Sequence, residues 1–128
     1  MTNPISSYLG VHGAALPLRE QRMQLLASNL SNADTPNYKA VDLEFQSVLE
    51  NAARNAAPGA GRAERVPGGL DPAARIFERP GVQPSLDGNT VDADTERAAY
   101  GRAALEYRAS LSFIESKVRT MLTAITGQ

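Results

Sequence analysis

The chain has 128 residues, with 13 Lys and Arg against 14 Asp and Glu and a net charge of −1. This length suits one domain rather than two. The near-neutral charge and the few aromatic side chains argue against nucleic acid as the main ligand, and the absence of Cys excludes disulfides, Cys-ligated zinc and thiol nucleophiles. Leu, Ile, Val and Phe together number only 27, so we expect a small hydrophobic core.

The first ten residues do not look like a targeting segment. Their sequence, MTNPISSYLG, has no basic region, no unbroken apolar run and no small-residue cleavage site, so we expect no cleaved secretory signal peptide. Since no segment approaches 18 consecutive apolar residues, we also expect no membrane-spanning helix.

Residues 5–33 are predicted to form a helix, because apolar side chains recur at alternating steps of four and three. This heptad seam contains Ile5, Leu9, His12, Leu16, Met23, Leu26, Leu30 and Ala33. A second line of Val11, Leu18 and Leu25 widens the apolar face. Pro17 lies inside the pattern and cannot donate the backbone bond of a helix interior, so the helix should either kink at Pro17 or begin there.

The following segment predicts a helix end and a turn. Asn29 and Asn32 are poor helix formers whose amides can bond the free carbonyls of the last helical turn and the chain that folds back over it. Thr35 precedes a proline and should be extended, while Pro36 and Asn37 suit the centre of a β-turn, type II included because Asn tolerates positive φ. An ordinary helix end and turn, with no function of its own, would explain the same residues.

Beyond this turn the apolar spacing changes from strand-like to helical. Apolar and polar residues alternate over residues 41–46, which predicts an extended piece with one buried face. From Phe45 to Ala56 the apolar residues adopt helical spacing, which predicts a short second helix.

The middle of the chain, residues 55–90, holds five of the eight prolines and six of the ten glycines, which excludes a long helix there. Two short apolar runs, residues 74–77 and 82–86, are followed by Asp87 and Gly88 as a turn pair. They could form a small hairpin or extended strands, or the whole segment could be a solvated linker.

A second long helix is predicted from residue 94 to residue 126, because its apolar steps of four and three are uninterrupted. Its seam contains Tyr100, Ala104, Tyr107, Leu111, Ile114, Val118, Met121 and Ile125. Asp92 or Asp94 can cap the first turn, Glu96 lies near the positive end of the helix dipole, and Gly127 ends the helix. Such a helix is roughly 50 Å long, whereas a compact globule of this size is about 36 Å across, so the helix must overhang it.

No set of residues predicts a catalytic or metal site. The acidic run before the last helix fails the calcium-loop pattern, because Asp92 stands where glycine is needed and Ala98 where a bidentate glutamate belongs. His12 has no acid or nucleophile partner in the pattern and indicates a packed or interface histidine. Arg19 and Arg22, like the other basic residues of the two helices, alternate with acids and indicate a solvated or subunit-facing surface. We therefore expect no cofactor, no metal and no small-molecule substrate.

The segment ASNLSNADTPNYK, residues 27–39, resembles the N-terminal signature of the bacterial flagellar axial proteins, the rod and hook family. The run YKAVDLEF that continues it, the run SLDGNTVD at residues 85–92, and a length without room for an inserted domain are similar to the small proximal rod proteins of this family. The residues of this signature turn are Asn29, Asn32, Asp34, Thr35, Pro36, Asn37, Tyr38 and Lys39. Asn37 stands where the family usually has glycine, and Pro17 falls inside a helix that the family makes continuous.

Residues and resemblance together predict a mainly α fold in one domain. Long N- and C-terminal helices would pack as a coiled-coil-like pair around a loop-rich middle with the hairpin described above. Residues 1–54 would hold the first helix, the turn and the short helix, residues 55–90 the linker, and residues 91–128 the last helix. The assembly seam would consist of Leu9, Leu16, Met23, Leu26, Leu30, Tyr107, Leu111, Ile114, Val118, Met121 and Ile125.

The resemblance implies a structural subunit of the flagellar basal-body rod without enzymatic activity, exported unfolded by the flagellar type III apparatus and assembled in the periplasm. Its partners would be copies of itself, other rod proteins, proteins of the membrane ring and of the ring–rod junction, and the export apparatus. A type III secreted effector or export cochaperone that binds a partner helix through coiled-coil ends would also explain the seams. Self-assembly separates these two hypotheses, because an effector should form small defined complexes.

Overall fold

The computed structural model describes residues 4–56, 76–81 and 85–127. The helices and strands of this part of the chain are, in order, α1 (Pro4–Ser31), β1 (Val41–Leu43), α2 (Phe45–Ala56), β2 (Ile76–Glu78) and α3 (Ala93–Thr126). The predicted class is confirmed, since two long terminal helices flank a loop-rich middle that contains a small antiparallel sheet.

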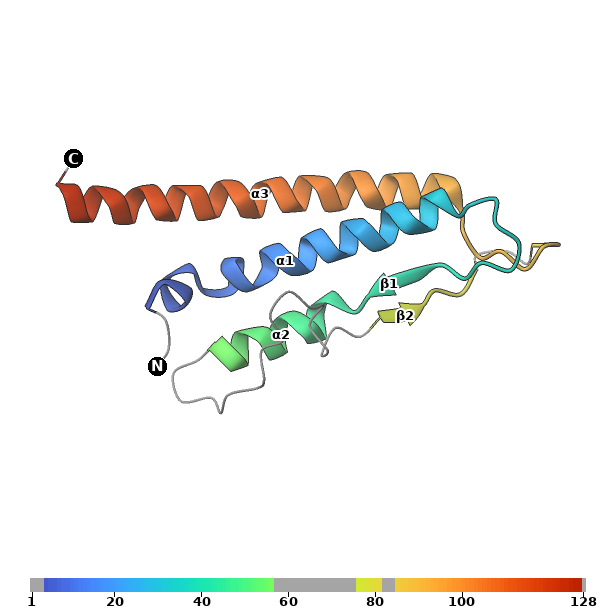
Figure 1. The fold of residues 1–128 in the computed structure, drawn as a ribbon, viewed down its shortest axis with the longest axis horizontal. Helices are drawn as coiled ribbons and strands as arrows, with labels where there is room; N and C mark the ends of the chain where they lie inside the picture. Colours follow the sequence, from blue (N-terminus) through green and yellow to red (C-terminus); the bar gives the residue numbers. More distant parts are fainter. Residues whose placement is uncertain (1–3, 57–75, 82–84, 128) are drawn as a thin grey trace.

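The elements lie in three layers, with α1 in the middle (Figure 1). Among the described helices and strands, α3 contacts only α1, while α2 and β1 pack against another side of α1. The N- and C-termini lie at one end of the elongated molecule, and the connections after α1 and before α3 lie at the other (Figure 1). This arrangement brings the two loops that resemble the family signature to the same end.

α1 is interrupted at Gly10, whose backbone has φ 57° and ψ −141°. Only glycine adopts such a conformation at low steric cost, and the short stretch before it leaves the line of the helix (Figure 1). The helix does not begin at Pro17, as one of the two expectations had it, because Pro17 lies inside the helix and the non-helical residue is Gly10. The break falls at the nearby residue that can bend the chain without a side-chain clash.

The sheet pairs two segments that are distant in sequence. Its antiparallel register places Val41, Asp42 and Leu43 opposite Glu78, Phe77 and Ile76, respectively. The N–H of Arg79 donates to the carbonyl of Ala40 at 2.7 Å and extends the ladder. β2 therefore pairs with the segment after α1. The run 82–86, the other half of the hairpin suggested by the sequence, lies partly outside the described residues. Pairing with β1 is favoured because it covers a strand that buries Leu43 in the core.

A small hydrophobic core lies between α1, β1 and α2. Its buried centre consists of Leu18, Leu43 and Val48, surrounded by Leu25, Phe45 and Leu49. Leu18 and Leu25 belong to the second apolar line of α1, so this line faces the short helix and the strand. The limited size of the cluster agrees with the composition.

Both ends of α3 carry the predicted caps. Asp92 Oδ1 accepts the backbone N–H groups of Asp94 at 3.1 Å and Thr95 at 3.2 Å. The hydrogen bond from the Thr95 N–H is the largest cause of a lowered pKa for Asp92. At the other end, Gly127 has φ 72° and donates its N–H to the Thr123 carbonyl at 2.8 Å. The helix thus begins and ends within a residue of its predicted bounds.

Candidate functional site at the turn after the first helix

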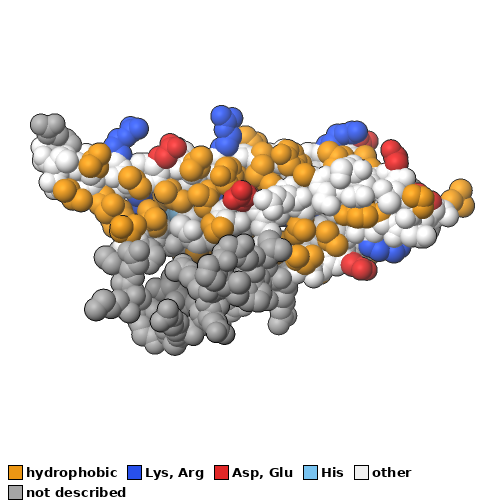
Figure 2. Space-filling model, in the orientation of Figure 1, with side chains coloured by type: hydrophobic (Ala, Val, Ile, Leu, Met, Phe, Trp, Pro, Cys, Tyr) orange, Lys and Arg blue, Asp and Glu red, His pale blue; other side chains and the backbone are white. Residues whose placement is uncertain are grey.

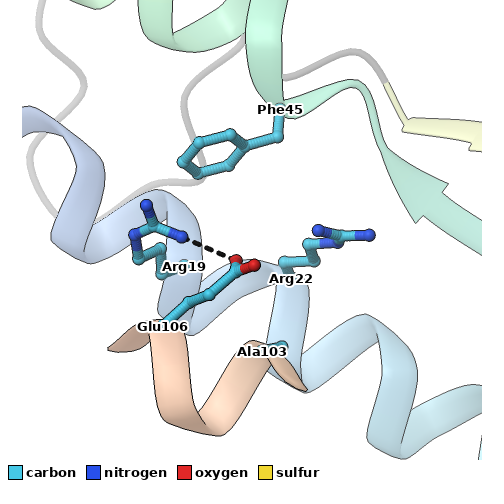
Figure 3. Close-up of a pocket in the computed structure, with 5 residues that line it drawn as sticks. All are labelled: Arg19, Arg22, Phe45, Ala103 and Glu106. Carbon is cyan, nitrogen blue, oxygen red and sulfur yellow. Dashed lines mark hydrogen bonds and ion pairs between the residues drawn. The ribbon is translucent and has the colours of Figure 1, made fainter. Parts of the chain in front are cut away.

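Two features that could hold a small ligand among the described residues would be a cluster of metal-binding side chains and a hollow between helices. No group of three or more His, Cys, Asp or Glu side chains in these ranges could hold a metal ion. The hollow in Figure 3, lined by Arg19, Arg22, Phe45, Ala103 and Glu106, has no volume for a water molecule. Across the same ranges, no helix combines the length and apolar character needed to cross a membrane.

Arg19 and Arg22, predicted to lie on a solvated or subunit-facing surface, are partly exposed and pair with acids of other elements of the chain. Arg19 Nη1 lies 2.7 Å from Glu106 Oε2 on α3, the ion pair drawn as a dashed line in Figure 3. Its guanidinium also lies 4.9 Å from the ring centre of Phe45. Arg22 Nε lies 3.1 Å from Oδ1 of the buried Asp42 on β1. The acidic partners are distant in sequence, so only the fold brings these pairs together.

Asn29 is fully buried near the end of α1 and uses both ends of its amide. Nδ2 donates to the Val41 carbonyl at 2.7 Å and to Glu96 Oε2 at 3.1 Å. Oδ1 accepts the Val41 N–H at 3.0 Å and the Tyr38 hydroxyl at 3.3 Å. Since an amide has two donors and two accepting lone pairs, its bonding capacity is filled. Asn29 thereby holds β1 and α3 against α1.

Asn32 bonds the end of α1 itself. Its Nδ2 donates to the Ser28 carbonyl at 2.8 Å, and its Oδ1 accepts the Thr35 hydroxyl at 3.1 Å. The two tasks predicted for the asparagine pair are therefore divided between them. Asn32 satisfies a carbonyl of the helix end, and Asn29 bonds the chain that folds back.

The predicted β-turn is present and is closed by the Tyr38 N–H, which donates to the Thr35 carbonyl at 3.3 Å. Its third residue, Asn37, has φ 60°, as expected for a position where the family usually has glycine. Asp34 and Pro36, the other members of this part of the signature, are exposed.

The turn packs closely against the loop before α3. The Asn37 N–H donates to the Asp87 carbonyl at 2.8 Å, and Lys39 Nζ donates to the Gly88 carbonyl at 2.6 Å. Gly88 has φ 73°, a backbone conformation that favours glycine, and a Cβ there would lie 2.6 Å from Oδ1 at the end of the Asn37 side chain. The side chain of Asp87 accepts the Asn89 N–H at 3.0 Å, and this bond is the largest cause of a lowered pKa for Asp87.

Asn89 is a buried residue of this site that sequence reasoning missed. Its Nδ2 donates to three carbonyls of the segment that leaves α1, those of Asn32 at 3.0 Å, Ala33 at 2.8 Å and Thr35 at 2.9 Å. Its Oδ1 accepts the Val91 N–H at 2.8 Å. Asn89 thus caps α1 from 57 residues further along the chain. The only signal was its place in a run that resembles the family, because no local pattern predicts so distant a contact.

The predicted seam of α3 lies at the edge of the face that packs on α1 and not at its centre. The buried residues of α3 are Glu96, Ala103 and Ser110. The last two each precede a seam residue, and one position in a helix is a rotation of about 100°. The half-buried seam residues are Tyr107, Leu111, Ile114 and Met121. Val118 and Ile125 are exposed, and Figure 2 shows hydrophobic side chains along the surface of the long helices.

On α1 the seam is more enclosed. Leu26 is fully buried. The half-buried seam residues are Leu9, Leu16, Met23 and Leu30. The ring of His12 lies 3.9 Å from that of Phe113 on α3, measured between centroids, with the planes tilted by 34°. His12 is therefore a packed histidine of the helix pair.

Comparison with known sequences adds a family to this geometry. The sequence model described as flagella basal body rod protein matches residues 9–39, which include the signature turn. A flagellar basal body rod protein FlgB of Cereibacter sphaeroides is 42% identical over 122 residues, covering 94% of each chain. FlgB of Aeromonas hydrophila is 38% identical over 93% of this chain and 92% of its own. FlgB of Salmonella typhimurium is 34% identical over 99% of both.

Proposed function

The chain belongs to the FlgB family of flagellar basal body rod proteins, and we propose that it builds the rod through the apolar seams of its two long helices. It is a structural subunit of the flagellar basal body rod and not an enzyme. A subunit of such a rod assembles with other rod proteins, so part of its surface must suit a protein neighbour.

The observation that carries the proposal is the apolar surface that α3 leaves uncovered. Val118, Leu122 and Ile125 are 43%, 57% and 76% exposed. Among the described helices and strands only α1 packs against α3, so their cover must come from elsewhere. A contiguous exposed apolar stripe marks a protein-binding surface, and burying each such side chain contributes about 1.5–3 kcal/mol. A helix of a neighbouring subunit along this stripe would supply that burial.

We extend the proposal to the position and route of the subunit. Copies of this chain and other rod proteins would cover the seams, and proteins of the membrane ring and of the ring–rod junction would contact the proximal rod. The flagellar type III apparatus would export the chain to the periplasm without a cleaved signal peptide. The resemblance to small proximal rod proteins supports this placement, and the sequence MTNPISSYLG supports the absence of a signal peptide.

The alternative function is that of a secreted effector or export cochaperone, which would bind its partner through the same helices. It would bind one partner helix in a small complex and would not join an axial structure. The relatives reported above are named as rod proteins, and they align with more than nine tenths of this chain. No feature of the site favours an effector or a cochaperone.

Val118→Asp tests the seam. A carboxylate there cannot be desolvated against a neighbour without a partner, so we expect export to continue while swimming in soft agar and basal-body assembly are lost. Because Val118 is half exposed within the single chain, the melting temperature of the Val118→Asp variant should differ little from that of the parent. We expect the same assembly defect for Leu111→Asp, whereas Thr123→Asp, an exposed control on the same helix, should swim normally. A motile Val118→Asp strain with normal rods would refute the seam.

A further inference from the structure

Four charged side chains meet where the strands join the helix pair. They are Arg22 from α1, Asp42 from β1, Arg79 from the residue after β2, and Glu96 from the start of α3. Glu96 is 2% exposed and Asp42 is 7% exposed. Two buried carboxylates and two partly exposed guanidinium groups from four segments therefore lie together and balance in charge.

Arg79 is the member of the cluster that touches both carboxylates. Its Nη1 lies 2.9 Å from Glu96 Oε1, and its Nη2 lies 3.3 Å from Asp42 Oδ2. Asp42 has a second cation, because Arg22 Nε lies 3.1 Å from its Oδ1. Glu96 is contacted on its other oxygen by the neutral amide of Asn29. Among the described residues, the positive charge beside Glu96 is therefore that of Arg79.

This contact joins two layers of the fold. We call residues 40–43 and 76–79 the arm. The arm lies on one side of α1, and α3 lies on another (Figure 1). Since Arg79 belongs to the arm and Glu96 to α3, their ion pair ties the arm directly to the helix pair.

The arm carries exposed apolar side chains whose place depends on its angle to the helices. Ile76 and Phe77 of β2 are 46% and 44% exposed. Successive residues of a strand point to opposite faces, so each face of the ribbon presents one of them. A two-stranded ribbon is marginally stable by itself, and its angle must be set by contacts outside it.

We propose that Arg79 is a positioning residue for rod assembly, which fixes the arm against α3 and so places Ile76 and Phe77 for contact with a neighbouring rod subunit. This inference rests on the proposed function. A buried carboxylate without its counter-charge is strongly unfavourable. Glu96 therefore favours the position of the arm in which Arg79 contacts it. The planar guanidinium suits two carboxylates at once, which the single ammonium of a lysine does not.

A distance measurement tests the positioning directly. The chain has no cysteine, so Glu78→Cys on the arm and Ala98→Cys on α3, both at exposed positions, accept spin labels at defined places. In the otherwise unchanged full chain we expect one narrow distance distribution by pulsed electron paramagnetic resonance. Arg79→Met should replace it with a broad one, and Arg79→Lys should recover it only in part.

A double variant separates the position of the arm from the stability of the fold. Arg79→Met leaves Glu96 uncompensated, so the single change could unfold the chain. Arg79→Met with Glu96→Gln removes both charges, and we expect its circular dichroism and melting to return toward those of the parent while the distances stay broad. Arg97→Met is the matched control, because Arg97 forms an exposed ion pair with Asp94 on the same helix. Its distances should stay narrow.

The same variants are then introduced into a strain whose own copy of the gene is deleted. We expect the double variant to be exported but to yield few basal bodies and little swimming, and Arg97→Met to behave as the parent. Narrow distances in the double variant, or normal rods despite broad distances, would each overturn the role of Arg79. The outcome for Val118→Asp is read separately. If Val118→Asp does not assemble into rods and the double variant does, only the positioning role of Arg79 is refuted. If Val118→Asp assembles normally, the proposed assembly seam is refuted.

Discussion

The amide of Asn29 sets how the end of α1, the strand β1 and the start of α3 meet. It makes four hydrogen bonds, one of them to the buried carboxylate of Glu96. A neutral hydrogen bond contributes about 0.5–1.5 kcal/mol net, and one to a charged group about 1.5–3 kcal/mol. The N–H and the carbonyl of Val41 both bond this amide, as they would bond a neighbouring strand of a sheet. Loss of the amide would therefore leave several buried polar groups unpaired at once.

Asn29→Ala should lower the free energy of unfolding by about 3 kcal/mol, because buried donors and acceptors would lose their partner without access to water. Urea unfolding followed by circular dichroism measures the change. Asn51→Ala, at an exposed position of α2, is the matched control and should stay within about 0.5 kcal/mol of the parent. Equal effects of the two substitutions would show that the Asn29 network is not what stabilises this end.

Asn37 tests the backbone of the signature turn. Because its φ is 60°, Asn37→Gly should leave the free energy of unfolding within about 0.5 kcal/mol of the parent, since glycine reaches this φ without strain. Asn37→Val should cost about 1–2 kcal/mol, because a β-branched side chain clashes with the backbone there. The same urea titration decides, and a valine variant as stable as the glycine variant would mean that the turn does not depend on positive φ.

Gly10 in α1 and Gly101 in α3 have similar open surroundings but different backbone conformations. A Cβ added at Gly10 in α1 or at Gly101 in α3 would meet nothing within 4 Å. Gly10, however, has φ 57° and breaks its helix, while Gly101 lies inside a helix that continues to Thr126. Any difference between alanine substitutions at these positions therefore reports the backbone.

Gly101→Ala should stabilise the chain by about 0.5–1 kcal/mol, because alanine is the better helix former. Gly10→Ala should destabilise it by about 1–3 kcal/mol, the cost of holding a side chain in this backbone region, or straighten the helix and pull Tyr8 away from Lys117. These two side chains are now in contact, with Lys117 Nζ 5.1 Å from the centre of the Tyr8 ring. Thermal unfolding gives the sign of each change, and stabilisation by both substitutions without any change at Tyr8 would contradict the break.

The burial of side chains on α3 changes along the length of the molecule. The buried residues of α3 lie between Glu96 and Ser110, where α1 packs against the helix. From residue 122 to residue 127 every side chain is exposed. One end of the helix pair is therefore covered by its own chain, while the end that carries the termini leaves apolar side chains exposed.

Hydrogen exchange on dilute monomer should follow this difference. We expect slow exchange around residues 96–110 and fast exchange over the last two turns of α3, because local opening is easiest where few apolar contacts are lost. The first turns of α1, ahead of the break at Gly10, should also exchange fast. In assembled rods both ends should become slow. Uniformly slow exchange in a proven monomer would mean that the single chain already stabilises both helices.

Several features of this protein follow from residues close to one another in sequence. The uninterrupted seam predicted α3 and its caps at Asp92 and Gly127, since helix periodicity and capping involve only neighbouring turns. The pair Pro36 and Asn37 predicted a β-turn, type II included, because turn geometry depends on the residues of the turn itself. The signature over residues 27–39 was also sufficient to suggest the family, because its asparagines and its turn lie within one short run of the sequence.

Long-range packing decided the rest. β2 could have paired within the middle segment, but pairing with β1 brings Arg79 beside Glu96 and covers Leu43. The seam of α3 is continuous, yet a neighbouring stripe with Glu96, Ala103 and Ser110 faces α1, because small and polar side chains let the helices and the Asn29 network meet. Asn89 caps a helix 57 residues away. Sequence by itself determined the helices, the turn and the family, whereas only tertiary structure determined which faces meet, because such contacts leave no periodic trace along the chain.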